Sequence, residues 1–80
     1  MSAFHELDAR GLLCPLPVIR TQNRMKELKA GERLIVKCTD PGALHDIPAW
    51  CRVHGHRLID SRQNDQEIVI EIEKLEETRV

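Results

Sequence analysis

The segment Arg33–Thr39 sets the firmest limit on the fold, because its β-branched residues form a nearly continuous apolar run. A run of this kind is typical of an inner strand that lies buried between neighbouring strands. With 80 residues, the chain buries only about 60 to 65% of its unfolded surface, which is enough for one domain with a single two-layer core. The remaining residues must therefore supply both the neighbouring strands and the helices that cover the sheet.

Three further segments are predicted to be strands. Phe4–Ala9 has an imperfect alternation of apolar and polar residues and is expected to form a short first strand. Arg57–Arg62 and Glu67–Glu73 are predicted to form a hairpin across the polar residues 63–66. The second arm of this hairpin has an apolar residue at every other position, which indicates one buried face: Ile68, Ile70 and Ile72.

The residues from Pro15 to about Lys29 are predicted to form an amphipathic helix. Apolar residues recur at helical spacing, and charged residues lie on another face. Ala30 and Gly31 are expected to end this helix before the inner strand begins. The apolar face consists of Val18, Met25 and Leu28, flanked by Ile19.

The residues from Ala43 to His54 also have a helical composition, but Pro48 lies among them. This proline would remove a hydrogen bond to the carbonyl of Leu44, so we expect that one helix cannot run straight through. The prediction is a short turn over residues 42–45, followed by a main helix from Ile47 to about His54. Asp46 is expected to be its N-cap.

The predicted order of elements is strand, helix, strand, helix, strand, strand. This βαβαββ order fits an α/β (α+β) two-layer sandwich, in which two helices cover one face of a four-stranded mixed sheet. We expect a single domain over residues 1–80, with an ordered core of about residues 4–73. The charged residues 74–80 are expected to fray.

A thiol stands where the first helix should begin, in the run Gly11-Leu12-Leu13-Cys14-Pro15-Leu16-Pro17. Gly11 turns the chain, and Pro15 suits the first helical position because its missing N–H would have no partner there. Pro15 also biases Cys14 toward the extended backbone of a helix cap. We therefore predict that Cys14 is the N-cap, beside the positive end of the helix dipole, where a thiolate is favoured.

The expected activation of this thiol is modest. A helix dipole contributes about 0.3 to 1 kcal/mol, which lowers a thiol pKa by only about 0.2 to 0.7. Pro15 and Pro17 also remove two backbone donors that could otherwise bond to the sulfur of Cys14. We predict a thiol that is exposed and rigidly presented, and that gains reactivity when a partner adds charge or excludes water.

The other two cysteines are expected to lie in the core. Cys38 continues the apolar face of the inner strand, and Cys51 follows Ile47 by one turn on the inward face of the second helix. A Cys-x-x-Cys redox motif is absent, because Pro17 stands at its fourth position. A reversible disulfide between Cys14 and Cys51 stays an alternative, and it requires Cα atoms within about 7 Å.

Other kinds of chemistry lack essential parts. Nothing in the sequence places a histidine beside Cys14, as a Cys-His hydrolase would require. The stretch from Cys51 to His56 contains residues that bind metals, but a structural zinc site needs a second pair of ligands, so we expect no metal. The histidines are expected to be surface residues: His5, His45, His54 and His56.

The charge balance excludes several classes of partner. Lys and Arg number 12 and Asp and Glu number 13, so the positive field that non-specific nucleic-acid binding needs is missing. Phe4 and Trp50 are the only aromatic residues, which makes a base-stacking surface improbable. Charges interrupt every apolar stretch, so we expect a cytoplasmic protein with protein or small-molecule partners.

Arg10, Arg20 and Arg24 are expected to form a basic patch below Cys14. Simple solvation explains most such charges, and the functional alternative is contact with an acidic partner. Leu16, which is expected to be exposed between the two prolines, could supply the apolar centre of that contact.

Taken together, these motifs resemble the small sulfur-carrier proteins of the TusA/SirA type. Cys-Pro-x-Pro alone would be a weak signal, but its order with the flanking motifs is specific and covers most of the chain. The matching runs are Leu7-Asp8-Ala9-Arg10-Gly11-Leu12-Leu13-Cys14-Pro15-Leu16-Pro17, Ala30-Gly31-Glu32, Thr39-Asp40-Pro41 and Asp46-Ile47-Pro48-Ala49-Trp50-Cys51.

The resemblance implies a two-layer α/β sandwich and a carrier role for Cys14, which would hold sulfane sulfur as a persulfide without a separate cofactor. It implies a cysteine desulfurase or a rhodanese as donor and a downstream relay protein as acceptor. The commonest destination is 2-thiolation of the wobble uridine in tRNA, and cytoplasmic sulfur metabolism is another. Asp40 and Asp46 match the second motif of the family, but turn formation and helix capping already explain them as structural residues.

We therefore expect a monomeric sulfurtransferase-type carrier with little turnover of its own. Two other classes of function stay open. One is a thiol redox protein that uses a Cys14–Cys51 disulfide. The other is a small RNA-binding or regulatory module, against which the near-neutral charge counts.

Overall fold

The computed structural model describes residues 4–75 and contains the four strands and two helices that the sequence predicts. The strands β1 and β4 have the predicted bounds, and β3 extends two residues further than expected. The elements are β1 (Phe4–Ala9), α1 (Leu16–Met25), β2 (Arg33–Cys38), α2 (Ala43–His54), β3 (Arg57–Asn64) and β4 (Glu67–Glu73).

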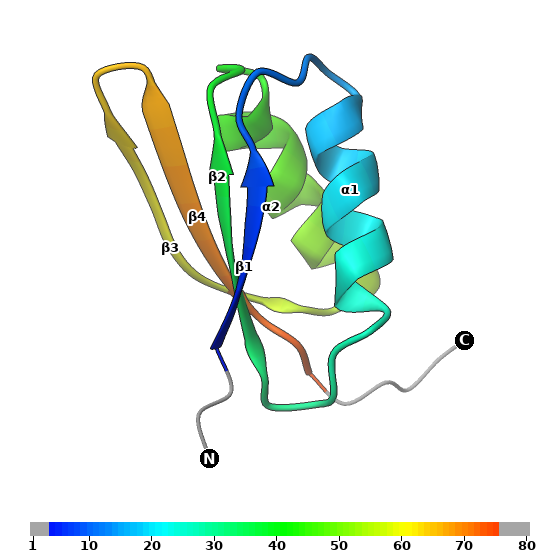
Figure 1. The fold of residues 1–80 in the computed structure, drawn as a ribbon. Helices are drawn as coiled ribbons and strands as arrows, with labels where there is room; N and C mark the ends of the chain where they lie inside the picture. The colour runs from blue at the N-terminus through cyan, green and yellow to red at the C-terminus, as the bar shows by residue number, and fades with distance from the viewer. Residues whose placement is uncertain (1–3, 76–80) are drawn as a thin grey trace.

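The strands form one mixed sheet in the order β1-β2-β4-β3. β1 runs parallel to β2, whereas β4 is antiparallel to both β2 and β3. Both helices lie on the same face of this sheet (Figure 1), which confirms the predicted two-layer α+β sandwich.

The core lies between the sheet and the helices and draws most of its side chains from the two inner strands, β2 and β4. Alternate residues of these strands are buried and face one another, as in the pairs Val36–Ile70 and Cys38–Ile68. The residues between them, such as Ile35, are only half-buried because they lie on the face that no helix covers. The segment predicted to be an inner strand is therefore central in the sheet but fully covered on one face only.

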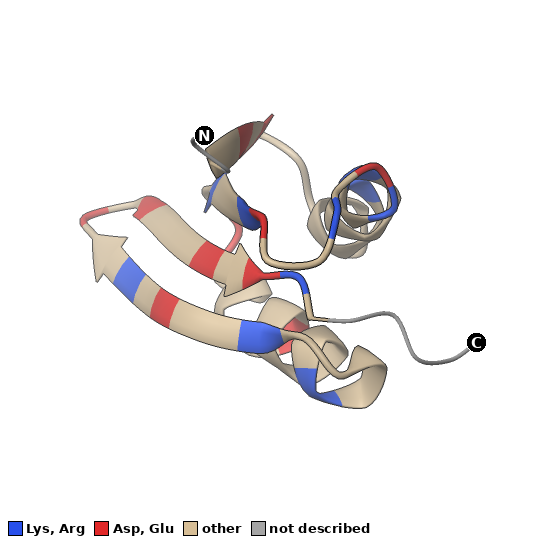
Figure 2. Cartoon of the chain, turned by 90° about the horizontal axis from the view of Figure 1, so that it is seen from below, with Lys and Arg blue, Asp and Glu red and all other residues tan. Residues whose placement is uncertain are grey.

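The uncovered face of the sheet carries charges of both signs. Figure 2 shows both basic and acidic residues along β3, whereas the charged residues of β4 are all acidic. Arg33 pairs with Glu71 at 3.1 Å, and Arg57 approaches Glu73 at 3.8 Å. Exposed pairs of this kind contribute little to stability, so this face mainly keeps an open sheet surface polar.

α1 begins later and ends earlier than predicted. Pro15 is its N-cap and Leu16 its first residue, so the prediction that Cys14 caps the helix is wrong. The cause is a separate turn before the helix, in which the N–H of Leu16 donates to the carbonyl of Leu13 at 2.8 Å. The Cys14–Pro15 peptide bond is cis.

The C-terminal end of α1 is held by Lys74, a residue that was expected to fray. Its ammonium group is buried and donates to the carbonyls of Met25 and Leu28, at 2.9 and 2.8 Å. A cation that caps the last carbonyls of a helix satisfies acceptors that have no partner within the helix. The ordered core therefore includes Lys74, and residues 76–80 of the predicted tail lie outside the described residues.

α2 runs without a break through Pro48, contrary to the predicted turn and shorter helix. Gly42 is the N-cap, so the prediction that Asp46 caps this helix is also wrong. Pro48 removes one hydrogen bond, but the helix buries one face against the sheet through Ala43, Ile47 and Cys51. This packing outweighs the missing bond, because most helix stability in proteins comes from burial of an amphipathic face.

Candidate functional site

Cys14 lies in the connection between β1 and α1, at the upper edge of the sheet in Figure 1. Because β1 and β2 are parallel, both strands end at this edge, and the loops that follow them meet there. Two hydrogen bonds join these loops. The N–H of Gly11 donates to the hydroxyl of Thr39 at 2.9 Å, and the N–H of Cys14 donates to Oδ2 of Asp40 at 2.8 Å.

Gly11 provides the backbone conformation that this connection needs. Its φ is +82°, in the left-handed region, where a residue with a Cβ would be strained. A Cβ added to Gly11 would meet nothing within 4 Å, so the requirement for glycine comes from the backbone and not from crowding. The predicted turn at Gly11 is therefore present.

The sulfur of Cys14 faces a carboxylate of α2. Cys14 Sγ donates a hydrogen bond to Asp46 Oδ2 at 3.2 Å. This bond raises the pKa of the Cys14 thiol above its ordinary value of 9.0, and the nearby charges of Asp46 and Asp40 act in the same direction. The sequence predicted a slightly lowered pKa from the dipole of α1, so the direction of that prediction is wrong. The dipole argument fails because Cys14 lies before the cap and beside a negative charge.

The two aspartates have different places in the site. Asp40 forms a turn, as predicted, since its Oδ1 accepts a 3.4 Å hydrogen bond from the N–H of Gly42. Its other oxygen holds the backbone of Cys14. Asp46 lies within the first turns of α2 and contacts the thiol instead of capping the helix. The contact of Asp46 with the thiol was not predicted.

The rim around the thiol is apolar. Pro15 is exposed, whereas Pro17 is buried against the core. Leu13, Leu16 and Ile19 are exposed by 71%, 41% and 45%. Exposed apolar side chains beside a reactive group are typical of a surface that a partner protein covers. We call these three residues the apolar rim.

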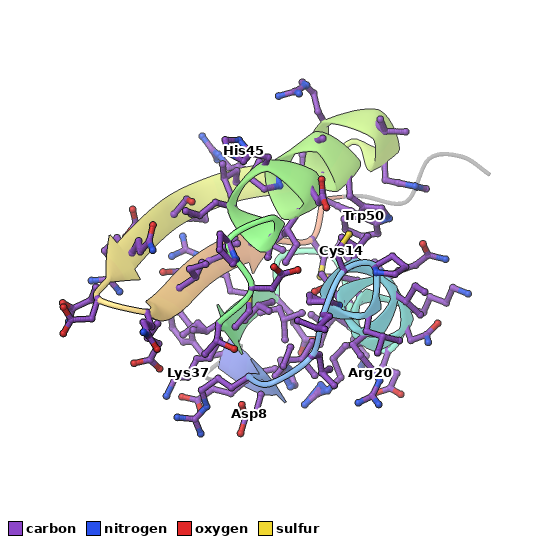
Figure 3. All side chains as sticks on the ribbon, turned by 90° about the horizontal axis from the view of Figure 1, so that it is seen from above. Asp8, Cys14, Arg20, Lys37, His45 and Trp50 are labelled. Atoms are coloured by element: carbon purple, nitrogen blue, oxygen red, sulfur yellow. The ribbon has the colours of Figure 1, made fainter. Side chains whose placement is uncertain are left out.

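The three arginines of the predicted basic patch have different surroundings. The guanidinium group of Arg10 donates to Asp8 at 2.8 and 3.0 Å and approaches Glu67 at 4.0 Å. Arg24 donates to the carbonyl of Glu6 at 3.4 Å. Arg20 is exposed but lies on the side of α1 that faces away from α2, whereas Cys14 lies on the α2 side (Figure 3).

The other two thiols are buried, as predicted. Cys38 and Cys51 are 0% and 1% exposed, and burial raises the pKa of each thiol to about 11. All three cysteines are free. Cys51 is buried and is not an exposed resolving thiol, which counts against the redox alternative.

The histidines near the end of α2 surround an aromatic side chain and not a metal site. The rings of His54 and His56 lie 4.8 and 5.3 Å from that of Trp50, whose indole N–H donates to Gln22 at 3.3 Å. A cavity of about 240 Å³ opens beside these rings, at the opposite end of α1 from Cys14. Within residues 4–75, no group of three or more potential metal ligands occurs.

Sequence reasoning missed Thr39 as a support of the site and Asp46 as the partner of the thiol. The signal was available in the predicted order of elements, because two parallel strands joined through a helix must bring their following loops together. The run Thr39-Asp40-Pro41 follows β2 directly, as the run with Cys14 follows β1. The reach of Asp46 could not be predicted, because it depends on α2 beginning before Pro48.

The chain is similar in sequence to a known protein family and to several of its members. The family model described as "Sulfurtransferase TusA" matches residues 5–74. YrkF and YrkI of Bacillus subtilis, whose names propose a sulfur-carrier role, are 48% identical over 59 residues and 45% identical over 60 residues. These matches cover 74% and 75% of this chain, but only 32% of YrkF against 80% of YrkI.

A solved structure confirms the fold independently of sequence. The crystal structure of a SirA-like protein from Desulfitobacterium hafniense superimposes with a TM-score of 0.78. The match covers 90% of this chain and 99% of that protein, at 24% sequence identity. Within residues 4–75, no helix is long and apolar enough to cross a membrane.

Proposed function

The chain belongs to the TusA family of sulfurtransferases, and we propose that it is a sulfur carrier in which Cys14 holds sulfane sulfur as a persulfide. The observation that carries the proposal is the exposure of Cys14, in contrast to the burial of the other two thiols. A carrier must meet a donor and then an acceptor, so its thiol has to be reachable by both. Only Cys14 meets this requirement among the three.

The transfer itself needs no oxidant. The sulfur of Cys14 attacks the outer sulfur of a donor persulfide R–S–SH, so a bond forms between Sγ and that sulfur while the donor S–S bond breaks. The donor leaves as R–S⁻ and takes up the proton that Cys14 has lost. Delivery to an acceptor thiol is the same exchange in the opposite direction.

We propose a cysteine desulfurase or a rhodanese as the donor and a downstream relay protein as the acceptor. The proposed destination is 2-thiolation of the wobble uridine in tRNA or another route of sulfur metabolism in the cytoplasm. The relatives named as sulfur carriers support the general role. A monomer suits this role, because one thiol has to dock with successive partners.

The apolar rim is the proposed contact surface for these partners. Leu13 and Leu16 are close to Cys14 in sequence, and Ile19 lies one turn further along α1. All three are exposed, so a partner that brings its own sulfur to Cys14 could bury them. The same contact would exclude water from the reacting sulfurs. Leu16, which the sequence singled out for this role, is one of the three.

Intact mass spectrometry after incubation with a cysteine desulfurase and cysteine tests the proposal. Wild-type protein is expected to gain one sulfur atom, which a reductant removes, and Cys14→Ser is expected to gain none. Cys38→Ala serves as the matched control, since it removes a buried thiol and should load normally. If no sulfur is gained from either the desulfurase or from a rhodanese with thiosulfate, the proposal is wrong.

A further inference from the structure

The thiol of Cys14 is exposed, yet its S–H group donates a hydrogen bond to a carboxylate of the same chain. Sγ donates to Asp46 Oδ2 at 3.2 Å, so Asp46 binds the protonated thiol and has nothing to offer the thiolate except repulsion. A nucleophilic thiol normally has the opposite surroundings, namely a cation, a histidine or a helix N-terminus that stabilises the thiolate. The contact therefore works against the reactivity that the carrier needs.

A second carboxylate strengthens the same effect. Asp40 and Asp46 converge on Gly42, since a Cβ on that glycine would lie 3.6 Å from Asp40 Oδ2 and 3.7 Å from Asp46 Oδ2. Both charged groups that act on the Cys14 thiol are thus negative, one from the loop after β2 and one from α2.

Two arginines that the sequence placed near Cys14 are directed elsewhere. Arg10 is engaged by Asp8 and Glu67, and Arg20 lies on the far side of α1 (Figure 3). Neither guanidinium group takes part in the hydrogen bonds of Cys14 with the two aspartates. A cation that would release the thiol from Asp46 is therefore best supplied from outside the chain.

We propose that Asp46 makes sulfur transfer at Cys14 conditional on a partner that carries a positively charged side chain beside its own reactive sulfur. When that cation pairs with Asp46, the S–H···O bond is lost and the thiol proton can leave. Without the cation, Cys14 stays a protonated and slow thiol. This inference deepens the proposed function and rests on it, because it names the chemistry that both donor and acceptor must present.

The exchange remains balanced under this control. The proton on Sγ passes from Cys14 to the leaving thiolate of the partner, either directly or by way of water, and Asp46 ends the step as the carboxylate that it was. One S–S bond forms, one S–S bond breaks, and no electron is added or removed. The role of the partner cation is electrostatic only.

Small disulfides of opposite charge test the requirement without any sulfur donor. The rate of mixed-disulfide formation at Cys14 would be measured by mass spectrometry with cystamine, which is a dication, and with 3,3′-dithiodipropionate, which is a dianion. The ratio of the cystamine rate to the dithiodipropionate rate would be measured for Cys14 and for the uncharged thiol N-acetylcysteinamide. Dividing the first ratio by the second removes the intrinsic difference in reactivity between the two disulfides. Wild-type protein is expected to favour cystamine by about five-fold or more, the effect of one unit charge at about 4 Å in water.

Three variants separate Asp46 from the general charge of the protein. Asp46→Asn should lose most of the preference for the cation, whereas Asp46→Glu, which keeps the charge, should retain it. Glu27→Gln is the matched control, because it removes one negative charge at the opposite end of α1 and should leave the preference unchanged.

The pH dependence of Cys14 alkylation gives a second measurement, which would not change if the role of Asp46 were only structural. The rate of Cys14 alkylation by the uncharged reagent iodoacetamide should reach its midpoint at a lower pH in Asp46→Asn than in wild type, since removal of the carboxylate favours the thiolate. Glu27→Gln should follow the wild-type profile. Circular dichroism would establish that each variant is folded.

The outcomes are decisive even if Asp46→Asn does not fold. Wild-type protein alone must prefer cystamine, and added salt must reduce this preference by screening the charge. A wild-type protein without charge preference, or a folded Asp46→Asn that keeps it, would overturn the inference. Charge preference without sulfur loading would refute the carrier role and leave only a charge-dependent reactivity of the Cys14 thiol. Loading without charge preference would refute the inference and leave the carrier role standing.

Discussion

Cys14 and Cys51 are cysteines in two different regions of one small domain. The pKa of each thiol is raised, but for a different main reason. In the core, burial raises the pKa of Cys51 to about 11. At the edge of the sheet, Cys14 is exposed, and the hydrogen bond to Asp46 is the main cause. Burial cannot be reversed without opening the fold. A hydrogen bond to one carboxylate can be removed by a partner. Only Cys14 can therefore be unreactive in the free protein and become reactive when a partner binds.

The two regions also differ in how they are built. The core consists of residues from regular strands and helices that alternate or repeat along the chain, and it would keep its shape with any well-packed apolar set. The site consists of single contacts between two loops and the first turns of α2, each made by one atom pair. The core is therefore tolerant in chemistry, whereas the site is specific.

Differential alkylation of the three cysteines should give the largest contrast between the regions. Cys14 is expected to react with iodoacetamide in the native protein about a thousandfold or more faster than Cys38 and Cys51, because the buried thiols react only when the domain opens. Peptide mapping after a pulse of reagent measures the three rates. Comparable rates at Cys14 and Cys51 would break the comparison.

A pair of apolar substitutions should separate core from rim in stability. Ile47→Ala, in the buried face of α2, is expected to cost about 2 to 5 kcal/mol in the free energy of unfolding. Leu16→Ala, in the apolar rim, should change it by about 0.5 kcal/mol or less. Urea unfolding followed by circular dichroism measures both, and a similar cost at the two positions would show that the rim is part of the core.

Alkaline pH should destabilise the protein through its buried thiols. The folded pKa of Cys51 is about 11 against an ordinary value of 9.0, so its contribution to stability is present below pH 9 and is lost as pH rises from 9 to 11. The melting temperature should fall over this interval, and the fall should be shallower in Cys51→Ala. Cys14→Ser should reduce the fall in melting temperature less than Cys51→Ala does. A larger reduction in Cys14→Ser would contradict the claim that the buried thiols cause the fall.

Acid should cause the smallest of the expected changes in stability, through the ion pair between Asp8 and Arg10. Hydrogen bonds from Arg10 lower the pKa of Asp8 from 3.8 to about 2. The group therefore stabilises the fold above pH 3.8, and this contribution is lost as pH falls toward 2. Asp8→Asn should show a slightly shallower acid-induced loss of melting temperature than wild type. An identical acid profile would mean that the pair contributes nothing measurable in solution.

Most of the fold could be predicted because strand patterns depend on neighbours in sequence. The alternation of Ile68, Ile70 and Ile72 and the apolar run of β2 define the two inner strands on their own, and the order of elements then restricts the topology. Helix ends were harder to predict. Leu13 forms a turn that displaces the cap of α1, and tertiary packing carries α2 through Pro48.

The site could be predicted in part. The sequence indicates that Cys14 is an exposed thiol held by a turn at Gly11, because local conformational preferences decide both features. It could not indicate the carboxylate at Sγ, since that contact joins residues 32 positions apart and depends on where α2 begins. The error in the direction of the Cys14 pKa follows from this single missing contact.

A direct titration of the thiols tests the central claim that one removable contact, more than burial, holds Cys14 in its protonated form. Protein labelled with ¹³C at the Cβ of cysteine would be titrated by NMR as wild type and as Asp46→Asn. The account predicts a Cys14 pKa above 9.0 in wild type that falls in the variant, while the pKa of Cys51 stays at about 11 in both. A wild-type Cys14 pKa below 9.0, or one that does not change in a folded Asp46→Asn, would contradict it.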